Sequence, residues 1–129
     1  MIKKIVVVLL LCSAALMLFV ACGGTTGNTS TSGSRNEVHM SYQTFVQSSV
    51  TISKGSSITL VNDVAVPHHI ANGTWDNNNA KPVKETNAPA VNVEFNGNDQ
   101  QVIGPFAMAG TYHLYCTVHQ GMNLTVIVQ

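Results

Sequence analysis

The sequence predicts an all-β fold, an antiparallel sandwich of about seven or eight strands. Apolar and polar residues alternate in several short stretches, which is the period of a half-buried strand. Turn segments rich in Gly, Asn and Ser separate these stretches, and no window of ordinary helix length has the apolar spacing of an amphipathic helix. With 129 residues, of which 45% are hydrophobic, the chain is long enough for one such domain and too short for two.

The N-terminal segment has the pattern of an export signal rather than of a folded element. A basic pair, Lys3 and Lys4, precedes the unbroken apolar stretch 5–20, and a cysteine, Cys22, ends the segment. The apolar stretch is somewhat shorter than the ~20 residues of a typical membrane-spanning helix. We therefore expect residues 1–22 to be a signal peptide that sends the domain out of the cytoplasm.

The end of this segment resembles the lipobox of bacterial lipoproteins, in which a cysteine after a small residue is lipidated and becomes the new N-terminus. The resemblance implies that Cys22 carries a lipid anchor and that the domain lies at the outer face of the cytoplasmic membrane. Phe19 stands where lipoboxes usually have leucine, so an uncleaved membrane anchor and plain secretion stay open. Residues 23–36 are Gly, Ser, Thr and Asn with a single Arg, a composition typical of a flexible tether.

The folded domain is expected over residues 37–129, with its first strand beginning near Val38. Phe45 falls out of phase in this strand, and segment 77–89 is too interrupted by Pro and Asn to form more than a loop with a single turn. The other apolar positions of the predicted strands are Met40, Tyr42, Val46, Ile58, Leu60, Val91, Val93, Phe95, Tyr112, Leu114, Cys116, Leu124, Val126 and Val128.

The charge of the chain excludes one class of partner. Six basic and six acidic side chains cancel, and no stretch gathers basic residues beyond Lys3 and Lys4. Nucleic-acid-binding proteins carry a basic patch or stripe, so we expect no nucleic-acid partner here. The same low charge favours docking to other proteins through an apolar surface, with modest dependence on salt.

Cys116 is the one cysteine expected to remain free in the exported domain. Cys12 lies in the apolar stretch and Cys22 is the expected anchor, so no disulfide partner is left. A free thiol in an oxidising compartment is liable to oxidation unless something occupies it. The alternation places Cys116 on the same side as Tyr112 and Leu114, so its side chain is expected to point toward the core at the end of a strand.

Several side chains could join Cys116 in a metal site. A thiolate is a soft ligand and an imidazole a borderline one, so Cys116 and His119 on one short loop can bind copper, zinc or nickel. The thioether of Met122 is rare around zinc and favours copper. His68 or His69, about fifty residues upstream, can supply a second imidazole, because loops of a sandwich meet at its ends. Two His and one Cys in a plane, with a weak axial Met, are the ligands of a blue-copper electron-transfer site.

These segments resemble the ligand motifs of the cupredoxins, the family that includes plastocyanin and amicyanin. Residues 67–70 read Pro-His-His-Ile where the family has Pro-His-Asn-Val, and residues 110–119 match the pattern that leads from Gly-Thr-Tyr through Cys to His. The short spacing from His119 to the methionine is similar to that of amicyanin. The resemblance covers residues from about 38 to 129. It implies a Greek-key β-sandwich with one type 1 copper ion, and the implied ligands are His68, Cys116, His119 and Met122.

Two residues depart from the family pattern. His69 stands in place of an Asn that helps to hold the ligand loops together, so either adjacent histidine can be the ligand; His68 is favoured because it directly follows the proline. Val118 stands where many relatives have proline, and it keeps its N–H. We hypothesise that this N–H donates to the Cys116 sulfur, in addition to a bond from the His69 amide, and so raises the reduction potential.

An apolar docking patch is implied at Pro105, Phe106 and Met108, because the resemblance places this segment next to the exposed ligand histidine. Ordinary loop packing is the alternative. The residues expected to have no part in the site are Trp75, as a packing residue, and His39 and His113, as solvent-facing side chains.

The resemblance implies one-electron transfer between a redox protein donor and a redox protein acceptor, with no small-molecule substrate and no enzymatic turnover. A copper-binding or delivery protein of the cell envelope, periplasmic or extracellular, is the alternative. A cysteine hydrolase is disfavoured because Cys116 points inward with no evident oxyanion donors. A multicopper oxidase needs paired His-x-His motifs, and the five histidines of the chain form none.

Overall fold

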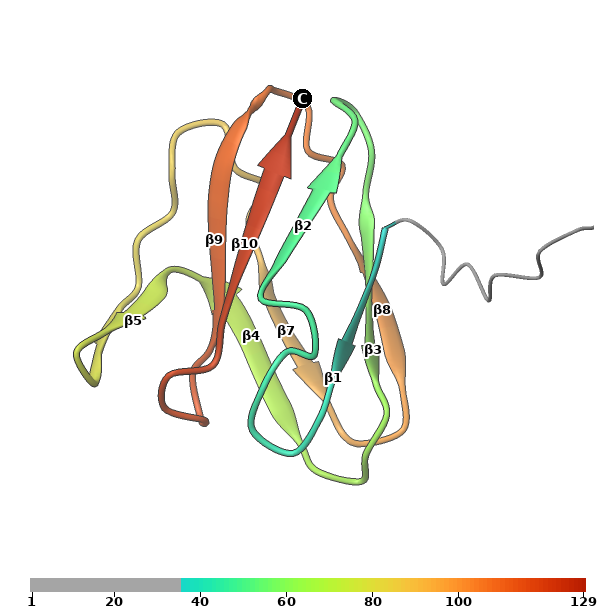
Figure 1. The fold of residues 1–129 in the computed structure, drawn as a ribbon, viewed down its shortest axis with the longest axis vertical. Helices are drawn as coiled ribbons and strands as arrows, with labels where there is room; N and C mark the ends of the chain where they lie inside the picture. Colours follow the sequence, from blue (N-terminus) through green and yellow to red (C-terminus); the bar gives the residue numbers. More distant parts are fainter. Residues whose placement is uncertain (1–35) are drawn as a thin grey trace, which may run out of the picture. The chain divides into compact units, whose positions relative to one another are not determined.

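The structure, a computed structural model, describes residues 36–129 of the chain (Figure 1). The expected signal peptide, the anchor at Cys22 and the tether up to residue 35 lie outside the described residues. Among residues 36–129, no helix is long and apolar enough to cross a membrane.

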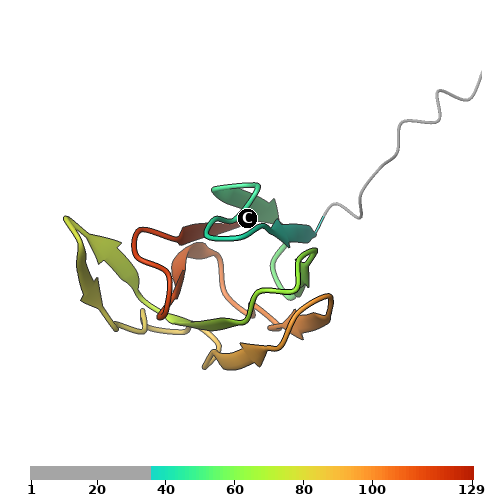
Figure 2. The ribbon, with the colours of Figure 1, turned by 90° about the horizontal axis from the view of Figure 1, so that it is seen from below.

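Residues 36–129 form an all-β sandwich, which confirms the predicted fold class. The strands of this part of the chain are β1 (Glu37–Met40), β2 (Ser49–Ile52), β3 (Ile58–Asn62), β4 (His68–Asn72), β5 (Thr74–Asp76), β6 (Asn79–Lys81), β7 (Asn92–Phe95), β8 (Gln100–Ile103), β9 (Gly110–Cys116) and β10 (Asn123–Val128). One sheet has the order β1-β3-β8, and the other has the order β2-β10-β9-β4-β7. Strands β5 and β6 form a separate hairpin, and the strands of the two sheets surround a common interior in Figure 2.

The strand arrangement differs from the predicted one in two respects. The pairings of β1 with β3 and of β10 with β2 are parallel, whereas the sequence predicts a purely antiparallel sandwich. The alternation of side chains has a period of two in both kinds of pairing, so it carries no information on strand direction. The described part of the chain also has ten strands instead of seven or eight, and the two strands of the β5–β6 hairpin, with three residues each, are too short to show a clear period.

The first strand ends earlier than the sequence pattern predicts. β1 stops at Met40, and an isolated bridge pairs Met40 with Phe45. Phe45 is 6% exposed and belongs to the core, whereas Tyr42 and Val46 are 67% and 64% exposed. The residue that interrupts the alternation is therefore the buried one, because the chain turns back after Met40 and changes which side chains face inward.

Strands β9 and β10 are neighbours inside the larger sheet and contribute much of the core. They pair antiparallel, with Leu114 opposite Leu124, and both of these side chains are fully buried. β9 is also paired with β4 on its other side. A strand paired on both sides has partners for its backbone groups along its length. The strand that ends at Cys116 is therefore held firmly in the sheet.

Gly73 allows the β5–β6 hairpin to start directly after β4. Its φ of +132° lies in a region that favours glycine. A Cβ atom at this position would lie 2.9 Å from Cε1 of Tyr115, and the Gly73 N–H donates to the His113 carbonyl at 3.0 Å. The hairpin can thus approach β9 closely only because position 73 has no side chain.

Candidate metal centre

Two strands bring together residues that are far apart in the sequence. β4 pairs antiparallel with β9, and Ile70 lies opposite Cys116 in their register. His68 precedes Ile70 by two residues and therefore faces the same side of the sheet. His119 lies in the site loop, which we define as residues 117–122 between β9 and β10. One strand end, one strand start and one short loop thus meet at the same place.

The donor atoms of three side chains converge at this end of the sheet. The Nδ1 atoms of His68 and His119 lie 3.7 and 3.4 Å from Cys116 Sγ, and 3.1 Å from each other. The point equidistant from the three atoms lies about 2 Å from each, close to the ~2.0–2.3 Å over which zinc binds imidazole and thiolate. The triangle therefore has the right size for one first-row metal ion.

Burial also fits a metal ion at this position. His68 is 2% exposed and Cys116 is fully buried, whereas His119 is partly exposed. Buried polar atoms normally have partners, and the three atoms here face one another rather than backbone groups. A bound cation would give all three a shared partner, so we take this donor cluster of His68, Cys116 and His119 as the metal centre.

Burial lowers the pKa of His68 below its ordinary value of 6.5, and the adjacent His119 lowers it further. The backbone of Ser41 and the carboxylate of Asp99 act in the opposite direction without reversing the shift. Neutral imidazole is the form that binds a metal ion. The lowered pKa therefore keeps His68 able to bind metal over a wider range of pH.

Met122 closes the site loop and is 1% exposed. Its carbonyl accepts a hydrogen bond from the Cys116 N–H at 3.0 Å, and its own N–H donates to the His119 carbonyl at 3.2 Å. These two bonds keep the end of the loop beside its start. A thioether added to a thiolate and two imidazoles gives a soft donor set that suits copper better than zinc.

The adjacent histidine, His69, has a different position. Its Nδ1 lies 2.7 Å from Thr117 Oγ1, and its Nε2 lies 2.8 Å from Asn92 Oδ1. Its carbonyl also accepts a hydrogen bond from the Thr117 N–H at 2.8 Å. His69 thus ties β4 to the site loop and to β7, while His68 enters the donor cluster.

The predicted docking patch at Pro105, Phe106 and Met108 does not lie next to His119 in the structure, although Met108 is 46% exposed. Phe106 is 1% exposed and packs against Tyr112, with ring centroids 5.6 Å apart. The segment precedes β9, whereas Cys116 is the last of the seven residues of that strand. A strand of this length spans about 20 Å, at ~3.4 Å per residue. The segment therefore lies at the end of β9 that is remote from the donor cluster.

A cavity of about 450 Å³ lies beside the two histidines of the donor cluster. Val66, Pro67 and Val118 contribute apolar side chains to its lining, and Glu94 contributes a carboxylate. The Val118 side chain is 61% exposed. The surface next to the partly exposed His119 is therefore largely apolar, and it is made by other residues than the predicted ones.

His39 and His113 take no part in the donor cluster. The Nδ1 atom of His39 lies 2.8 Å from Asp63 Oδ2, and that of His113 lies 2.6 Å from Glu85 Oε1. Their side chains are 34% and 43% exposed, so both lie at the surface as the sequence predicts. The sequence did not predict their carboxylate partners, which come from distant segments.

Sequence reasoning missed several residues that support the cluster. Thr117 and Asn92 hold His69, and the indole Nε1–H of Trp75 donates to the Cys116 carbonyl at 2.8 Å. Thr117 lies inside the ligand motif, where a hydroxyl is a recognisable hydrogen-bonding group. Trp75 and Asn92 have no such signal, because their contacts depend on how β5 and β7 lie against their neighbours.

Comparison with known sequences places the chain among copper-binding proteins. The family model described as copper binding proteins, plastocyanin/azurin family, matches residues 29–129. Plastocyanin from Ulva prolifera is 30% identical to the chain over 87 residues, which make up 66% of the chain and 86% of that protein. Plastocyanin from Scenedesmus fuscus is 35% identical over 89 residues, again with 66% and 86% covered.

Solved structures show the same fold. Amicyanin from Paracoccus versutus has a TM-score of 0.55 at 24% identity, with 72% of the chain and 79% of amicyanin covered. A purple cupredoxin from Nitrosopumilus maritimus has a TM-score of 0.54 at 20% identity, with 72% and 98% covered. The family match includes every residue of the donor cluster. The chain therefore belongs to the plastocyanin/azurin family of copper-binding proteins, and its cofactor is copper in a type 1 site.

Proposed function

We propose that the protein is a one-electron carrier that receives electrons from one redox protein and passes them to another. The donor cluster is the observation that carries this proposal, since two imidazoles and a buried thiol meet within 3.1–3.7 Å. His68, Cys116 and His119 would hold the copper ion, and Met122 would add a thioether to this donor set. The bound copper supplies a one-electron couple, and no substrate has to bind to it.

The chain contributes a rigid set of donors. Cys116 ends a strand that is paired on both sides, and its N–H is bonded to the Met122 carbonyl. Thr117 is held by His69 through both its N–H and its hydroxyl. Donors that are locked by such neighbours stay in place when the charge of the site changes. This rigidity suits repeated electron transfer better than the uptake and release of metal.

His119 is the proposed electron port, because it is the partly exposed member of the donor cluster. Val66, Pro67 and Val118 offer an apolar surface next to it. A partner that covers these side chains excludes water and brings its own redox centre close to the imidazole edge. Since acidic and basic side chains balance, docking here is expected to depend only modestly on salt.

We also propose that the domain works at the outer face of the cytoplasmic membrane, anchored by a lipid on Cys22 and separated from it by tether 23–36. The support for this is the sequence pattern of the N-terminal segment. Mass spectrometry of the protein from a bacterial host is expected to find a lipidated N-terminal Cys22. An unmodified thiol at that position would overturn the lipid anchor.

Voltammetry distinguishes the proposed carrier from a copper-delivery protein of the cell envelope. The copper-loaded protein is expected to give a reversible one-electron wave and to keep its metal over many cycles. Release of copper on reduction, without a reversible wave, would favour delivery over electron transfer.

A further inference from the structure

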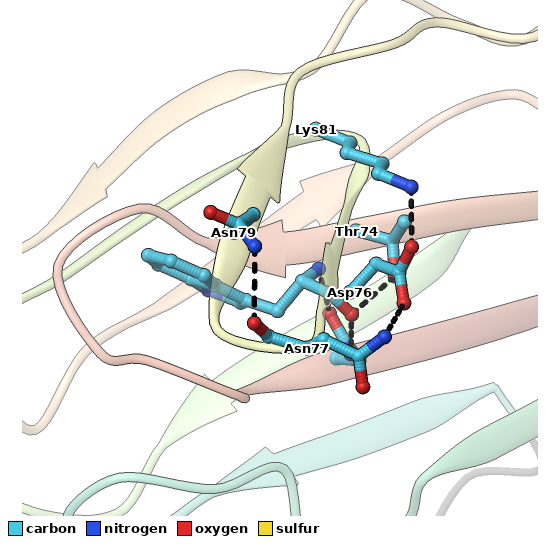
Figure 3. A network of polar contacts seen from close by, with 7 residues as sticks. Thr74, Asp76, Asn77, Asn79 and Lys81 are labelled. Carbon is cyan, nitrogen blue, oxygen red and sulfur yellow. Dashed lines mark hydrogen bonds and ion pairs between the residues drawn. The ribbon is translucent and has the colours of Figure 1, made fainter.

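The β5–β6 hairpin has a stabilising network of its own (Figure 3). Asn77 and Asn78 have φ values of 46° and 67°, as a two-residue type I′ turn requires. The Asn77 side chain donates to Asp76 Oδ1 at 3.1 Å, and Asn79 donates to the Asn77 carbonyl at 3.1 Å. Lys81 pairs with Asp76 across the two strands. Because a two-stranded hairpin is only marginally stable alone, its contacts with the larger sheet also matter.

Trp75, in the middle of β5, connects this hairpin to both ends of the site loop. Its Nε1–H donates to the Cys116 carbonyl at 2.8 Å, just before the loop begins. Its backbone N–H donates to Asn123 Oδ1 at 2.7 Å, and its carbonyl accepts from Asn123 Nδ2 at 3.0 Å, just after the loop ends. The indole ring also meets Tyr115 edge-on, with centroids 6.0 Å apart. Trp75 thus binds both the end of β9 and the start of β10, the two strands that the site loop connects.

The bond from Trp75 fixes the peptide of the cysteine ligand. The Cys116 N–H donates to Met122, and the Cys116 carbonyl accepts from the indole, so both polar groups of this residue are occupied. A second link joins the hairpin to the loop itself, since Gln120 Nε2 donates to the Asn78 carbonyl at 3.3 Å. Rotation of the Cys116 backbone would leave part-buried polar groups without partners. The direction of the thiol therefore depends on the hairpin.

We propose that Trp75 is a positioning residue for the copper site, and that it holds the site loop in the ligand geometry whether or not metal is bound. The inference rests on the proposed copper site. Residues that orient metal ligands typically change metal affinity by about 10–100-fold when they are replaced. Loss of the indole N–H is therefore expected to weaken copper(II) binding and to loosen the loop in the metal-free protein.

The variant Trp75→Phe tests this, because it keeps an aromatic ring and removes the donor to Cys116, together with one of the two fused rings of the indole. In the metal-free protein, amide hydrogen exchange at Cys116 and Met122 is expected to become about tenfold faster or more, with exchange in β3 unchanged. In competition titrations with copper(II), Kd is expected to rise about tenfold or more.

The matched control is Tyr112→Phe, which also removes an aromatic donor to a backbone carbonyl, that of Met108 at 2.8 Å. In this control, the amide exchange rates at Cys116 and Met122 and the Kd for copper(II) are expected to stay at the wild-type values. The proposal is overturned if Trp75→Phe behaves like this control in both measurements.

A second variant, Asn123→Ala, keeps the indole and removes the two bonds between the Trp75 backbone and the side chain at the start of β10. It is expected to speed amide exchange at Met122 and to weaken copper(II) binding. If β3 of Trp75→Phe also loses protection, that variant is destabilised as a whole, and Asn123→Ala is then compared with the control Tyr112→Phe in its place. If the wild-type protein binds no copper(II), the proposed function fails, and the exchange rates still decide whether Trp75 positions the loop.

Discussion

Ile70 of β4 lies directly opposite Cys116 of β9, and this pairing places His68 beside the thiol. The 3.7 Å between His68 Nδ1 and Cys116 Sγ joins residues 48 positions apart in the sequence. A slip of one residue in the pairing would turn His68 to the opposite face of the sheet. The metal centre therefore forms only when these two strands pair correctly in the folded domain.

Replacing His69 by alanine is expected to weaken copper(II) binding by about 10–100-fold. The change removes the side-chain bonds to Thr117 and Asn92 and so loosens the site loop, which keeps only the bond from the Thr117 N–H to the carbonyl of residue 69. A competition titration with a copper(II) chelator measures the loss. The variant His69→Asn, which has the residue usual in the family, is expected to lose less. Equal affinities for the wild type and His69→Ala would contradict the linking role of this side chain.

Replacing Val118 by proline is expected to lower the reduction potential of the copper-loaded protein. Proline removes the N–H that we expect to donate to the Cys116 sulfur, and hydrogen bonds to that sulfur favour reduced copper. Cyclic voltammetry measures the shift. The control Val118→Ala keeps the N–H and shortens a side chain that is 61% exposed, so its potential is expected to stay close to that of the wild type. An unchanged or higher potential in Val118→Pro would remove the basis for the hydrogen-bond hypothesis.

The metal-free protein is expected to lose stability as the pH falls below 6.5, the ordinary pKa of the His68 side chain. Burial and His119 lower the pKa of His68 in the folded state, so between the two pKa values the unfolded chain binds more protons. Stability from this group is therefore fully present above 6.5 and declines toward the folded pKa.

Urea denaturation of the metal-free wild type and of His68→Gln across this pH range provides the measurement. The free energy of unfolding of the wild type, relative to that of the variant, is expected to fall as the pH is lowered. Two parallel curves would show that His68 titrates alike in the folded and unfolded states.

Truncation of the core at β9 is expected to reduce stability strongly. Leu114 is fully buried opposite Leu124, and a buried Leu→Ala change typically lowers the free energy of unfolding by about 2–5 kcal/mol. Val102 is 71% exposed, so Val102→Ala is a surface control expected to stay within about 0.5 kcal/mol of the wild type. Chemical denaturation checks both, and a loss below about 1 kcal/mol in Leu114→Ala would contradict the central place of β9.

The part of the site that comes from the end of β9 and the site loop can be predicted from the sequence, because its donors are close together along the chain. Cys116, His119 and Met122 lie within seven consecutive residues, where ligand type and spacing alone define a soft donor set. The choice between His68 and His69 is different. It follows from the register of β4 with β9, and the sequence favours His68 only through the preceding proline and a family resemblance.

The features that could not be predicted depend on contacts between elements. Phe106 has an apolar neighbourhood, but nothing in it shows at which end of β9 the segment lies. Trp75 is a single aromatic residue in a polar stretch, so it has no period and no motif until the hairpin is placed against Cys116. Parallel pairing of β1 with β3 escapes prediction for a related reason, since alternation shows which residues face inward and not how strands run.

The visible spectrum of the copper(II)-loaded protein tests the central claim most directly, with the variant Cys116→Ala measured alongside. The wild type is expected to be intensely blue or green, from charge transfer between the Cys116 thiolate and copper(II). Cys116→Ala is expected to lose this colour while still binding copper(II) weakly through its histidines. A pale wild-type protein, or a colour that survives in Cys116→Ala, would contradict the assignment of Cys116 as the thiolate ligand of a type 1 site.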